Sequence, residues 1–507
     1  MHDPRSSTVD DVLHRSATRT PDRVALRFAE RTWTYRDLDD AVTRAAGVLL
    51  STGAQPGDRV ATYGRNSDAY LLAFLGCARA GLVHVPINYA LTGPELAYLL
   101  EQSGSRLVLV DPALRGSLDA VAGGVAVMPL RDTDDSLLAG ASDGPVPELD
   151  VTVSDTDLVQ LLYTSGTTSR PKGAMMTHRA LVHEYLSSVL ALQCAPDDDP
   201  LHCMPLYHSA GMHVFLMPYL AVGAVNSLME VPDVTEVLRR VEAEHAGALF
   251  LAPTVWVPLA NHPDLATRDL TSLRKAFYGA SIMPVPVLNR LQEALPGLAF
   301  YNCFGQSEIG PLATVLPPEE HAERPESCGR PVLFVEVRVV DETGADVGPD
   351  IAGEVLYRSP QLCTGYWGDP EASEAAFDGG WFHSGDLVRR DAEGYLYVVD
   401  RIKDVINTGG MLVASREVED ALYTHPGVAE VAVVAIADPR WIEAVTAVVV
   451  RRDSAAGREV DEATLIAHAK ESLAGFKAPK RVHFVAELPR NQSGKLLKRV
   501  LRDELTT

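Results

Sequence analysis

The chain has 507 residues, of which 46% are apolar, and its formal net charge is −23. A single hydrophobic core stops growing well below this length, so we expect at least two domains. The strong acidity argues against nucleic-acid partners and against binding to anionic membranes, because both need a basic face.

We expect no membrane-spanning or secretory segment. The longest uncharged apolar stretch, residues 214–225, is too short to cross a bilayer and contains Pro218. The first residues lack the apolar core of a signal peptide. The six cysteines are scattered without a C-x-x-C pair, which favours reduced thiols over disulfides or a zinc site. A cytoplasmic protein with no integral membrane segment is therefore predicted.

The predicted elements alternate between helices and strands through the first 300 residues. Apolar residues recur with helical spacing over 9–17 and 35–52. Short apolar runs predict strands over 24–28, 59–63, 83–87, 106–110, 158–162, 248–252 and 275–278. This alternation is typical of α/β architecture with mostly parallel, helix-flanked sheets.

The pattern changes near residue 331. Runs at 336–340, 353–357 and 395–399 lie between glycine-rich turns and predict a β-rich subdomain over about residues 331–400. A helix over 415–425 and a strand over 428–436 follow. We expect a large N-terminal domain over 1–400, a small α+β domain over 401–507 and a hinge at 400–403.

The last 34 residues differ in charge from the rest of the chain. They carry eight lysines or arginines and three acids, a net charge of +5. A solvated face is the usual explanation for such a segment. The alternative is a module that handles anionic small molecules such as nucleotides or CoA.

The most informative segment is residues 163–173, Tyr-Thr-Ser-Gly-Thr-Thr-Ser-Arg-Pro-Lys-Gly. It follows the predicted strand 158–162, so hydroxyls, backbone N–H groups and the Lys172 ammonium meet at one turn. A polyphosphate needs this set of donors. Pro171 stands where the Walker A pattern requires glycine. A plain Ser/Thr/Gly surface turn is the alternative.

This segment resembles the phosphate-binding loop of the adenylate-forming superfamily, T-S-G-T-T-G-x-P-K-G, with Ser169 in place of the second glycine. Acyl-CoA synthetases, aryl-CoA ligases, luciferases and peptide-synthetase adenylation domains form this superfamily. The resemblance implies two mostly parallel sheets in the large domain and a mobile small domain. It also implies that ATP is bound by Thr164, Ser165, Gly166, Thr167, Thr168 and Lys172.

Residues 302–308, Asn-Cys-Phe-Gly-Gln-Ser-Glu, resemble the superfamily's Y-G-x-T-E motif. The resemblance implies nucleotide-binding roles for Asn302, Phe304, Gly305 and Ser307. It makes Glu308 a catalytic residue and, with Thr164, the expected Mg²⁺ site, because a hard cation prefers oxygen ligands and also bridges ATP phosphates. Taken alone, a glutamate after a loop is more often a helix cap.

Two further motifs concern the ribose and the hinge. Residues 381–386 resemble W-x-x-T-G-D, which implies that Asp386 accepts hydrogen bonds from the ribose hydroxyls. Residues 400–403, Asp-Arg-Ile-Lys, resemble the next signature. There Arg401 reaches ribose or phosphate and Lys403 is the hinge residue.

The following motif concerns the acceptor. Gly409 and Gly410 match glycines that let backbone approach the pantetheine tunnel of CoA. Leu412 and Ser415 depart from the asparagine and proline that the superfamily carries there.

Residues 488–495 resemble the C-terminal P-x-x-x-x-G-K loop and place Lys495 at its tip. The resemblance implies that Lys495 is catalytic. Its ammonium would contact both the substrate carboxylate and the α-phosphate, offset their repulsion and stabilise the transition state. An ordinary solvated lysine is the alternative.

Residues 205–211, Pro-Leu-Tyr-His-Ser-Ala-Gly, resemble the start of the acyl-pocket helix. His208 is the expected catalytic gate between the carboxylate and the thiol entrance, with a structural histidine as the alternative. The acyl-pocket candidates are His208, Gly211, Met212, Trp256, Tyr278 and Gly279. Gly279 and Ala280, in a segment that resembles the G-G-A loop, are also expected beside adenine.

An α-amino acid substrate is disfavoured. Peptide-synthetase adenylation domains carry, near this motif, an aspartate that pairs with the amino group. This chain has no acid at that place. The apolar pocket candidates instead favour a fatty, aryl or bulky cyclic carboxylic acid.

We therefore predict an ATP-dependent acyl-CoA synthetase that uses ATP, Mg²⁺ and CoA. The acid and ATP give acyl-AMP and pyrophosphate; rotation about Lys403 then withdraws Lys495, and CoA gives acyl-CoA and AMP. Alternatives are a ligase that loads a carrier-protein phosphopantetheine, a luciferase-like oxygenase, and a non-catalytic nucleotide-binding scaffold. The sequence leaves a homodimer open.

Overall fold

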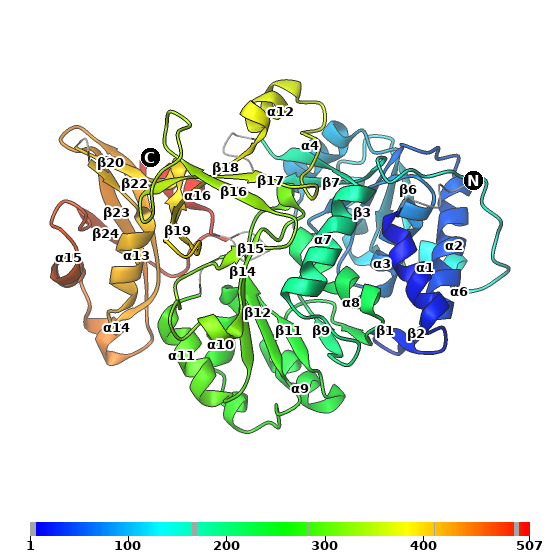
Figure 1. Ribbon diagram of the computed structural model, residues 1–507, viewed down its shortest axis with the longest axis horizontal. Helices are drawn as coiled ribbons and strands as arrows, with labels where there is room; N and C mark the ends of the chain where they lie inside the picture. Colours follow the sequence, from blue (N-terminus) through cyan, green and yellow to red (C-terminus); the bar gives the residue numbers. More distant parts are fainter. Residues whose placement is uncertain (1–6, 165–169, 282, 410, 491–495, 507) are drawn as a thin grey trace. The chain divides into compact units, whose positions relative to one another are not determined.

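Four β-sheets organise the chain in the computed structural model (Figure 1). The structure describes residues 7–164, 170–281, 283–409, 411–490 and 496–506. The chain forms two compact units. The first consists of Met1–Val337 and Tyr357–His383, and the second of Arg338–Leu356 and Ser384–Thr507. The expected domain boundary at 400–403 stays a prediction.

The first unit contains a six-stranded sheet in the order β6-β5-β3-β4-β7-β8. Its neighbouring strands are parallel except for the antiparallel pair β7 and β8. The strands are β3 (Arg59–Tyr63), β4 (Val83–Ile87), β5 (Leu107–Val110), β6 (Ala126–Pro129), β7 (Leu158–Thr164) and β8 (Lys172–Thr177).

Both faces of this sheet are buried, which explains its unbroken apolar runs. In β5, Leu107 and Leu109 pack into one core with α2 (Tyr35–Ser51) and α3 (Asp68–Arg79), whereas Val108 and Val110 pack into another core with α4 (Gly93–Ser103). Successive side chains of a strand point to opposite faces, so a strand covered on both sides carries no polar alternation.

A nine-stranded sheet in the same unit has the order β15-β14-β13-β12-β11-β9-β10-β1-β2. Its central strands are parallel, and antiparallel strands close both edges. The strands are β1 (Val24–Phe28), β2 (Arg31–Thr34), β9 (Pro200–His202), β10 (Asn226–Leu228), β11 (Ala248–Phe250), β12 (Lys275–Gly279), β13 (Ala299–Phe304), β14 (Thr314–Leu316) and β15 (Arg330–Pro331).

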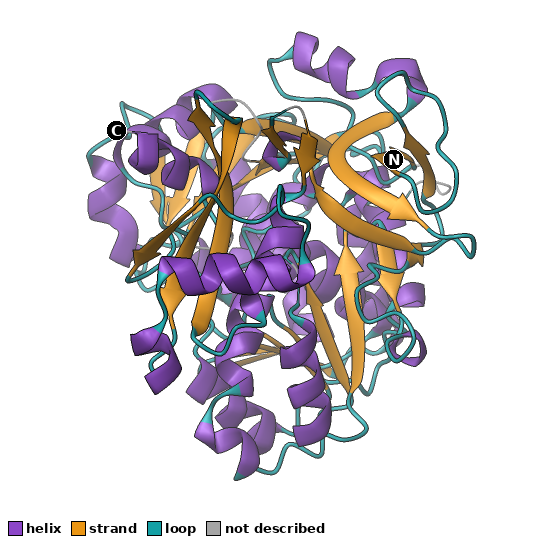
Figure 2. Ribbon diagram, turned by 90° about the vertical axis from the view of Figure 1, so that its left-hand side faces the viewer, coloured by secondary structure: helices purple, strands orange, loops and turns teal. Residues whose placement is uncertain are grey.

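Helices lie against the strands (Figure 2), and the α-helices of the first unit run from α1 to α12. They are α1 (Val9–Arg19), α2 (Tyr35–Ser51), α3 (Asp68–Arg79), α4 (Gly93–Ser103), α5 (Arg115–Asp119), α6 (Leu137–Ser142), α7 (His178–Ala191), α8 (Met217–Val222), α9 (Val234–Glu244), α10 (Pro253–Ala260), α11 (Val285–Ala294) and α12 (Pro370–Ala376). The expected strand 248–252 ends early because Pro253 opens α10, as proline favours a first helical turn.

A chain of neutral polar side chains crosses the core of the first unit. Gln160 on β7 donates to His84 Nδ1 (2.9 Å) and accepts from His213 Nε2 (2.7 Å). His84 in turn contacts the Thr62 hydroxyl, and the Tyr185 hydroxyl contacts His213 Nδ1. Burial lowers the pKa of both histidines to about 3, so each stays neutral and every ring nitrogen has a partner.

The second unit contains a five-stranded sheet, with order β21-β20-β23-β22 and β24 beside β23. Its strands are β20 (Ile406–Thr408), β21 (Met411–Val413), β22 (Val428–Asp438), β23 (Ile442–Arg451) and β24 (Arg481–Val485). A four-stranded sheet consists of β16 (Glu336–Val340), β17 (Ala352–Arg358), β18 (Phe382–Arg390) and β19 (Leu396–Arg401).

Helices cover both faces of the five-stranded sheet. Val433 packs with α13, and the next residue, Val434, packs with Leu501 of the C-terminal helix. The helices are α13 (Ser415–Tyr423), α14 (Ala455–Glu459), α15 (Glu462–Ser472) and α16 (Lys498–Thr506). The predicted fold class, a large α/β part with mostly parallel sheets and a smaller α+β part, is confirmed. Within the described ranges, no helix has the length and apolarity needed to span a bilayer.

Candidate active site

The predicted nucleotide residues gather where parallel strands of the nine-stranded sheet end. Tyr278 and Gly279 on β12 are in register with Asn302 and Cys303 on β13. Ligands of α/β proteins bind outside the carboxyl ends of such strands. A Cβ added to Gly279 would lie 2.2 Å from the Cys303 carbonyl oxygen, so only glycine allows this approach.

The backbone just beyond these strands has unusual conformations. Ala280 has a φ of +63°, in the left-handed region that side chains rarely adopt. Gly305 has a φ of +155°, and an added Cβ there would lie 2.0 Å from the Pro311 carbonyl oxygen. The predicted residues Phe304 and Ser307 flank this turn and are half-buried. Strained backbone of this kind concentrates at functional sites.

Glu308 and Thr164 lie together, as the predicted metal site requires. The Thr164 hydroxyl at the end of β7 donates to Glu308 Oε1 at 2.8 Å. The Tyr366 hydroxyl lies 3.3 Å from the same oxygen, and Glu308 is only 7% exposed. This oxygen-rich group fits Mg²⁺, which takes one or two carboxylates and completes its shell with water and substrate phosphates. A cluster of three metal-binding side chains is absent from the described residues, as that coordination allows.

Lys172 lies beside Thr164 and Tyr366, two residues that contact the Glu308 carboxylate. It is the register partner of Thr164 in the antiparallel pair β7 and β8. Its ammonium lies 5.3 Å from the centre of the Tyr366 ring and 3.9 Å from Asp369. The strand pair therefore brings both ends of the phosphate loop to Glu308. The predicted residues Ser165, Gly166, Thr167 and Thr168 lie outside the described residues.

Tyr366 has no counterpart among the sequence predictions. Its partner Glu308 is 58 residues away, and no spacing pattern joins the two. Burial raises the pKa of the Tyr366 hydroxyl, and the nearby Glu308 charge raises it further. The phenol therefore stays protonated and donates to the carboxylate, which orients Glu308.

The segment with His208 adjoins the metal motif. His208 is half-buried, and the hydroxyl of Ser209 beside it lies 2.8 Å from the Ser307 hydroxyl. The following turn, Ala210–Leu216, is a π-helix in which Met217 N–H bonds to the Met212 carbonyl. The resemblance implies the start of a helix here without giving its type. Pro218, which has no N–H, accounts for part of the π-helical geometry, and π-helical turns often mark functional sites.

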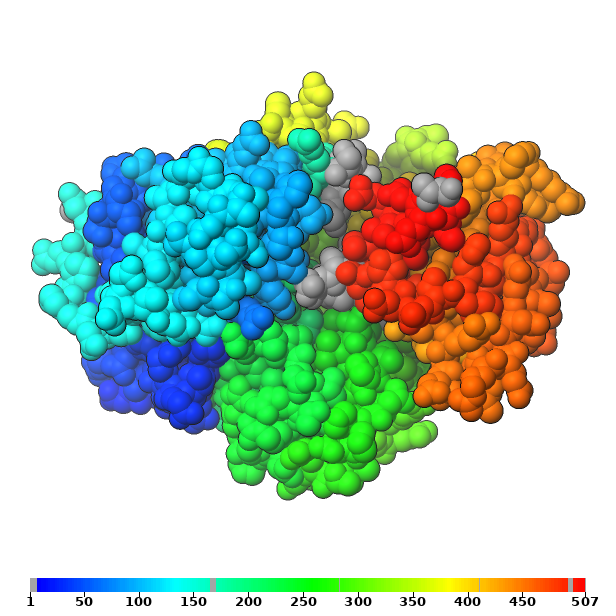
Figure 3. Space-filling model, turned by 180° about the vertical axis from the view of Figure 1, so that it is seen from behind, coloured from blue at the N-terminus to red at the C-terminus, as the bar shows by residue number. Residues whose placement is uncertain are grey.

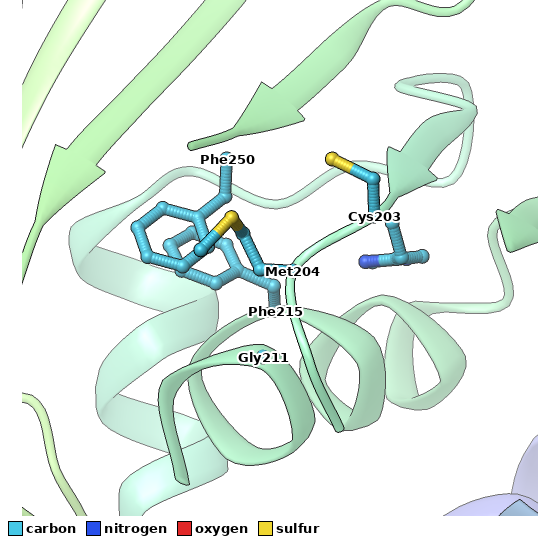
Figure 4. A pocket seen from close by; sticks show the side chains of 6 residues that line it. Cys203, Met204, Gly211, Phe215 and Phe250 are labelled. Atoms are coloured by element: carbon cyan, nitrogen blue, oxygen red, sulfur yellow. The ribbon is translucent and has the colours of Figure 1, made fainter. Parts of the chain in front are cut away.

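An apolar cavity lies beside Gly211 (Figure 4). It is lined by His202, Cys203, Met204, Gly211, Phe215 and Phe250. The Phe215 and Phe250 rings stack with centroids 4.1 Å apart. The cavity volume is about 10 Å³, close to the room for one water-sized sphere. An added Cβ on Gly211 would lie 2.7 Å from the Pro205 carbonyl oxygen, so glycine allows the π-helix to pack here.

The other acyl-pocket candidates lie in the packed interior. Trp256 and Met212 are fully buried, and the Trp256 indole donates to the Phe277 carbonyl at 3.0 Å. The Tyr278 hydroxyl lies 3.0 Å from His321 Nε2. Asn302 donates its side-chain amide to the Ser327 carbonyl. Contact of these residues with a substrate stays a prediction.

In the second unit, the structure pairs the two residues expected at the ribose. Asp386 on β18 and Arg401 on β19 are register partners, and Arg401 Nε lies 2.9 Å from Asp386 Oδ1. Lys403 is exposed in the short turn Ile402–Asp404 that follows. Gly409 has a φ of +64° and donates its N–H to the Trp441 carbonyl. Gly410 and Lys495 lie outside the described residues.

A buried ionic network joins the predicted hinge to α16. Asp400 Oδ2 accepts from the Ser415 backbone N–H (2.6 Å) and hydroxyl (2.8 Å). The Lys498 ammonium donates to the Ser415 hydroxyl and lies 2.8 Å from Glu419. These bonds explain why this chain has Ser415 where the superfamily motif has proline, because proline has no N–H to donate to Asp400. The network fixes the start of α16, three residues after Lys495, beside residue 400.

Comparisons with known proteins identify the family of the chain. The family of AMP-binding enzymes matches residues 13–367, and the C-terminal domain of AMP-binding enzymes matches residues 417–495. A feruloyl-CoA synthase from Amycolatopsis sp is 38% identical over 489 residues, 96% of this chain and 97% of that protein. An indoleacetate–CoA ligase from Aromatoleum aromaticum is 33% identical, with 96% of each chain covered. The ATP-bound crystal structure of MatB from Rhodopseudomonas palustris superposes with a TM-score of 0.90 at 31% identity, covering 99% of each chain.

Proposed function

The chain belongs to the family of AMP-binding enzymes, and we propose that it joins a hydrophobic aromatic carboxylic acid to CoA. Within this family it is an acid–thiol ligase that uses ATP, Mg²⁺ and CoA. The contact among Thr164, Glu308 and Tyr366 carries the proposal, because it unites the phosphate loop, the metal motif and a third segment in one site.

In the first half-reaction, a carboxylate oxygen of the acid attacks the α-phosphorus of ATP. The bond to the β-phosphate oxygen breaks, and acyl-AMP and pyrophosphate form. Bound Mg²⁺ would neutralise phosphate charge, held by Glu308 and the Thr164 hydroxyl. Lys172 adds a positive charge beside these phosphates. The Lys495 ammonium offsets the repulsion between carboxylate and phosphate.

In the second half-reaction, the CoA sulfur attacks the acyl carbon and AMP leaves. We place the turn at Lys403 at the pivot between the two half-reactions and Gly409 beside the incoming pantetheine. The left-handed φ of Gly409 supports this placement, because it favours glycine, and a glycine leaves the turn without a side chain beside the pantetheine. Asp386 and Arg401 hold the ribose, and their 2.9 Å ion pair fixes both side chains on neighbouring strands.

The aromatic class of acid rests on the similarity to relatives, because the apolar cavity beside Gly211 has room for about one water molecule and does not outline an aryl ring. The 38% identity to a feruloyl-CoA synthase supports the same class.

Free CoA is the proposed acceptor. An acidic carrier protein would need an unpaired basic surface, and many basic side chains of the C-terminal segment, red in Figure 3, form ion pairs within the second unit. Ion pairs join Lys477 with Glu417, Arg481 with Asp438, Arg490 with Glu430, Lys498 with Glu419 and Arg502 with Asp404. These contacts pair five of the eight basic side chains of the segment with acids of the second unit.

Pyrophosphate release measured over a panel of acids tests the proposal. We expect ferulate and related cinnamic or aryl acids to exceed fatty acids of similar carbon number, with α-amino acids inactive. CoA and a phosphopantetheinylated carrier protein then compete for the preformed adenylate. A preference for fatty acids would overturn the aromatic class, and faster transfer to the carrier would overturn the acceptor.

A further inference from the structure

A buried carboxyl group stands directly behind the segment that carries Glu308. Glu184 lies on α7, in the second turn of the helix, and is completely buried. Burial raises the pKa of this carboxyl well above its usual range, against the smaller opposing effect of hydrogen bonds from Leu312 and Ser188. A carboxyl group kept in a protein interior is costly unless its polar atoms are bonded.

The Glu184 carboxyl is bonded on both oxygens. Oε1 accepts from the backbone N–H of Leu312 at 3.2 Å and from the Ser188 hydroxyl at 3.1 Å. Oε2 accepts from the Gln361 side-chain amide at 2.6 Å. The carboxyl therefore connects α7 to the segment after Glu308 and to Gln361, a residue 177 positions along the chain.

Gln361, also completely buried, completes the connection. Its amide nitrogen lies 3.3 Å from the Ile309 carbonyl and 3.1 Å from the Leu312 carbonyl. Its own oxygen accepts from the Ser187 hydroxyl on α7 at 2.6 Å. Glu184 and Gln361 together thus bind both ends of residues 309–312.

The backbone of residues 309–312 packs closely against the Glu184 carboxyl group. Gly310 has a φ of +105°, and an added Cβ would lie 3.0 Å from Glu184 Oε2. On the other side, the Cys363 N–H donates to the Glu308 carbonyl at 2.8 Å. The main chain from the Glu308 carbonyl to Leu312 is therefore fixed by buried hydrogen bonds.

We propose that Glu184 and Gln361 are positioning residues that set the orientation of Glu308 toward Mg²⁺ without touching metal or substrate. The proposal rests on the proposed role of Glu308 as the metal ligand. Mg²⁺ accepts little deviation from octahedral geometry, so a loosened ligand loses affinity. Hydrogen-bond partners behind metal ligands are commonly worth 10- to 100-fold in metal affinity.

The test compares Glu184→Ala with Leu186→Ala, a change of similar kind at a half-exposed position of the same helix. Calorimetry of ATP binding at varied Mg²⁺, without acid or CoA, measures the metal requirement without turnover. We expect Glu184→Ala to need about tenfold more Mg²⁺ for half-maximal ATP binding. Leu186→Ala should match the wild type. Glu184→Gln, which keeps the volume but replaces one acceptor oxygen by an amide donor, should give a requirement between those of Glu184→Ala and the wild type.

A second readout follows the backbone itself. Hydrogen exchange in the ligand-free protein should be faster at the Leu312 amide in Glu184→Ala, because this N–H loses its acceptor, and unchanged in Leu186→Ala. If Glu184→Ala fails to fold, Ser187→Ala and Ser188→Ala each remove one hydroxyl from the same cluster. These should raise the Mg²⁺ requirement about two- to threefold, an order-of-magnitude expectation for one lost neutral hydrogen bond.

Two outcomes would overturn the proposal. One is faster exchange at Leu312 with an unchanged Mg²⁺ requirement in Glu184→Ala, which would make the cluster purely structural. The other is an equal Mg²⁺ shift in Leu186→Ala, which would reflect general loosening of α7. Glu308→Gln, measured in parallel, distinguishes failure of the positioning role of Glu184 from failure of the metal role of Glu308. If Glu308→Gln leaves the Mg²⁺ requirement unchanged, Glu308 is not the metal ligand.

Discussion

The two units hold their functional residues by different kinds of bond. Around Glu308 in the first unit, the supporting groups are buried and mostly neutral: hydroxyls, a side-chain amide and a carboxyl whose pKa is raised by burial. Around the predicted hinge in the second unit, the supports are ion pairs. Arg401 pairs with Asp386, and Lys498 with Glu419.

The two kinds of bond differ in how strongly they respond to the surroundings. Neutral hydrogen bonds in a packed interior are insensitive to salt and define a single geometry, which suits a metal ligand. Ion pairs respond to ionic strength, pH and the arrival of an anionic substrate. We infer that the first unit supplies a fixed adenylation site and that the second supplies the parts that change partners between half-reactions.

The largest effect is expected from the loop of the second unit. Lys495→Ala should reduce adenylate formation by about 10²- to 10³-fold, because one pre-placed cation that stabilises the transition state is removed. Transfer from supplied acyl-AMP to CoA should be nearly unchanged. Pyrophosphate release and thioester formation are measured separately, and equal loss of both would contradict the division between half-reactions.

The next largest effect concerns the buried ion pair of the second unit. Burial alone would lower the pKa of Lys498, but Glu419 and Asp400 outweigh it and raise the pKa, so the ammonium remains charged. Lys498→Met leaves Glu419 without its cation and should cost about 3 kcal/mol of unfolding free energy in the second unit. Urea unfolding measures this.

Arg458→Ala is the control for that change. Arg458 forms an ion pair with Asp453, but both side chains are largely exposed. An exposed pair contributes little, so its loss should leave the urea midpoint nearly unchanged. Equal midpoints for Lys498→Met and the wild type would show that the network does not stabilise the second unit.

A smaller effect concerns pH and the first unit. The folded pKa of His84 and of His213, about 3, lies below the ordinary value of 6.5. The unfolded chain therefore binds more protons between these values, so stability is complete above about pH 6.5 and falls as pH decreases. Lowering the pH from 7 to 5 should therefore reduce the free energy of unfolding by roughly 1–2 kcal/mol for each histidine.

Urea unfolding of the first unit at the two pH values measures the loss, with His213→Gln as the comparison. This variant should lose less stability on acidification than the wild type, because one of the two buried groups no longer titrates. An identical pH dependence in both proteins would show that the polar chain through Gln160 does not set acid sensitivity.

The smallest expected effect is at the turn beside the proposed pantetheine site. Gly409→Ala places a side chain at a φ of +64° and should cost about 1 kcal/mol of stability. Thioester formation should slow more than adenylate formation, since the added methyl group would stand near the incoming thiol. Measuring both half-reactions checks this, and a selective loss of adenylation would place the turn elsewhere in the mechanism.

Much of the fold follows from local patterns in the sequence. The strands 59–63 and 83–87 have their predicted bounds, because both faces of their sheet are buried and their apolar runs are unbroken. The π-helix over 210–216 does not follow from such patterns. Its apolar residues suit an ordinary helix, and only packing of Gly211 against Pro205 and the proline at 218 select the wider turn.

The residues of the candidate site also fall into two groups, those that sequence motifs predict and those that they do not. Thr164 and Glu308 each belong to a motif that the resemblance assigns to the metal site, so their meeting could be anticipated. Tyr366, Gln361 and Glu184 could not, because each acts on residues far away in the chain and belongs to no motif. Tertiary packing alone brings these three side chains to the metal motif.

The most direct test of the account is ATP–pyrophosphate exchange driven by ferulate, measured at varied Mg²⁺ in the wild type and in Glu308→Gln. We predict rapid exchange in the wild type. Glu308→Gln should reduce exchange about 10- to 100-fold and recover partly at high Mg²⁺, because one oxygen ligand has lost its charge. Exchange with the same rate and the same Mg²⁺ dependence in both proteins would contradict the account.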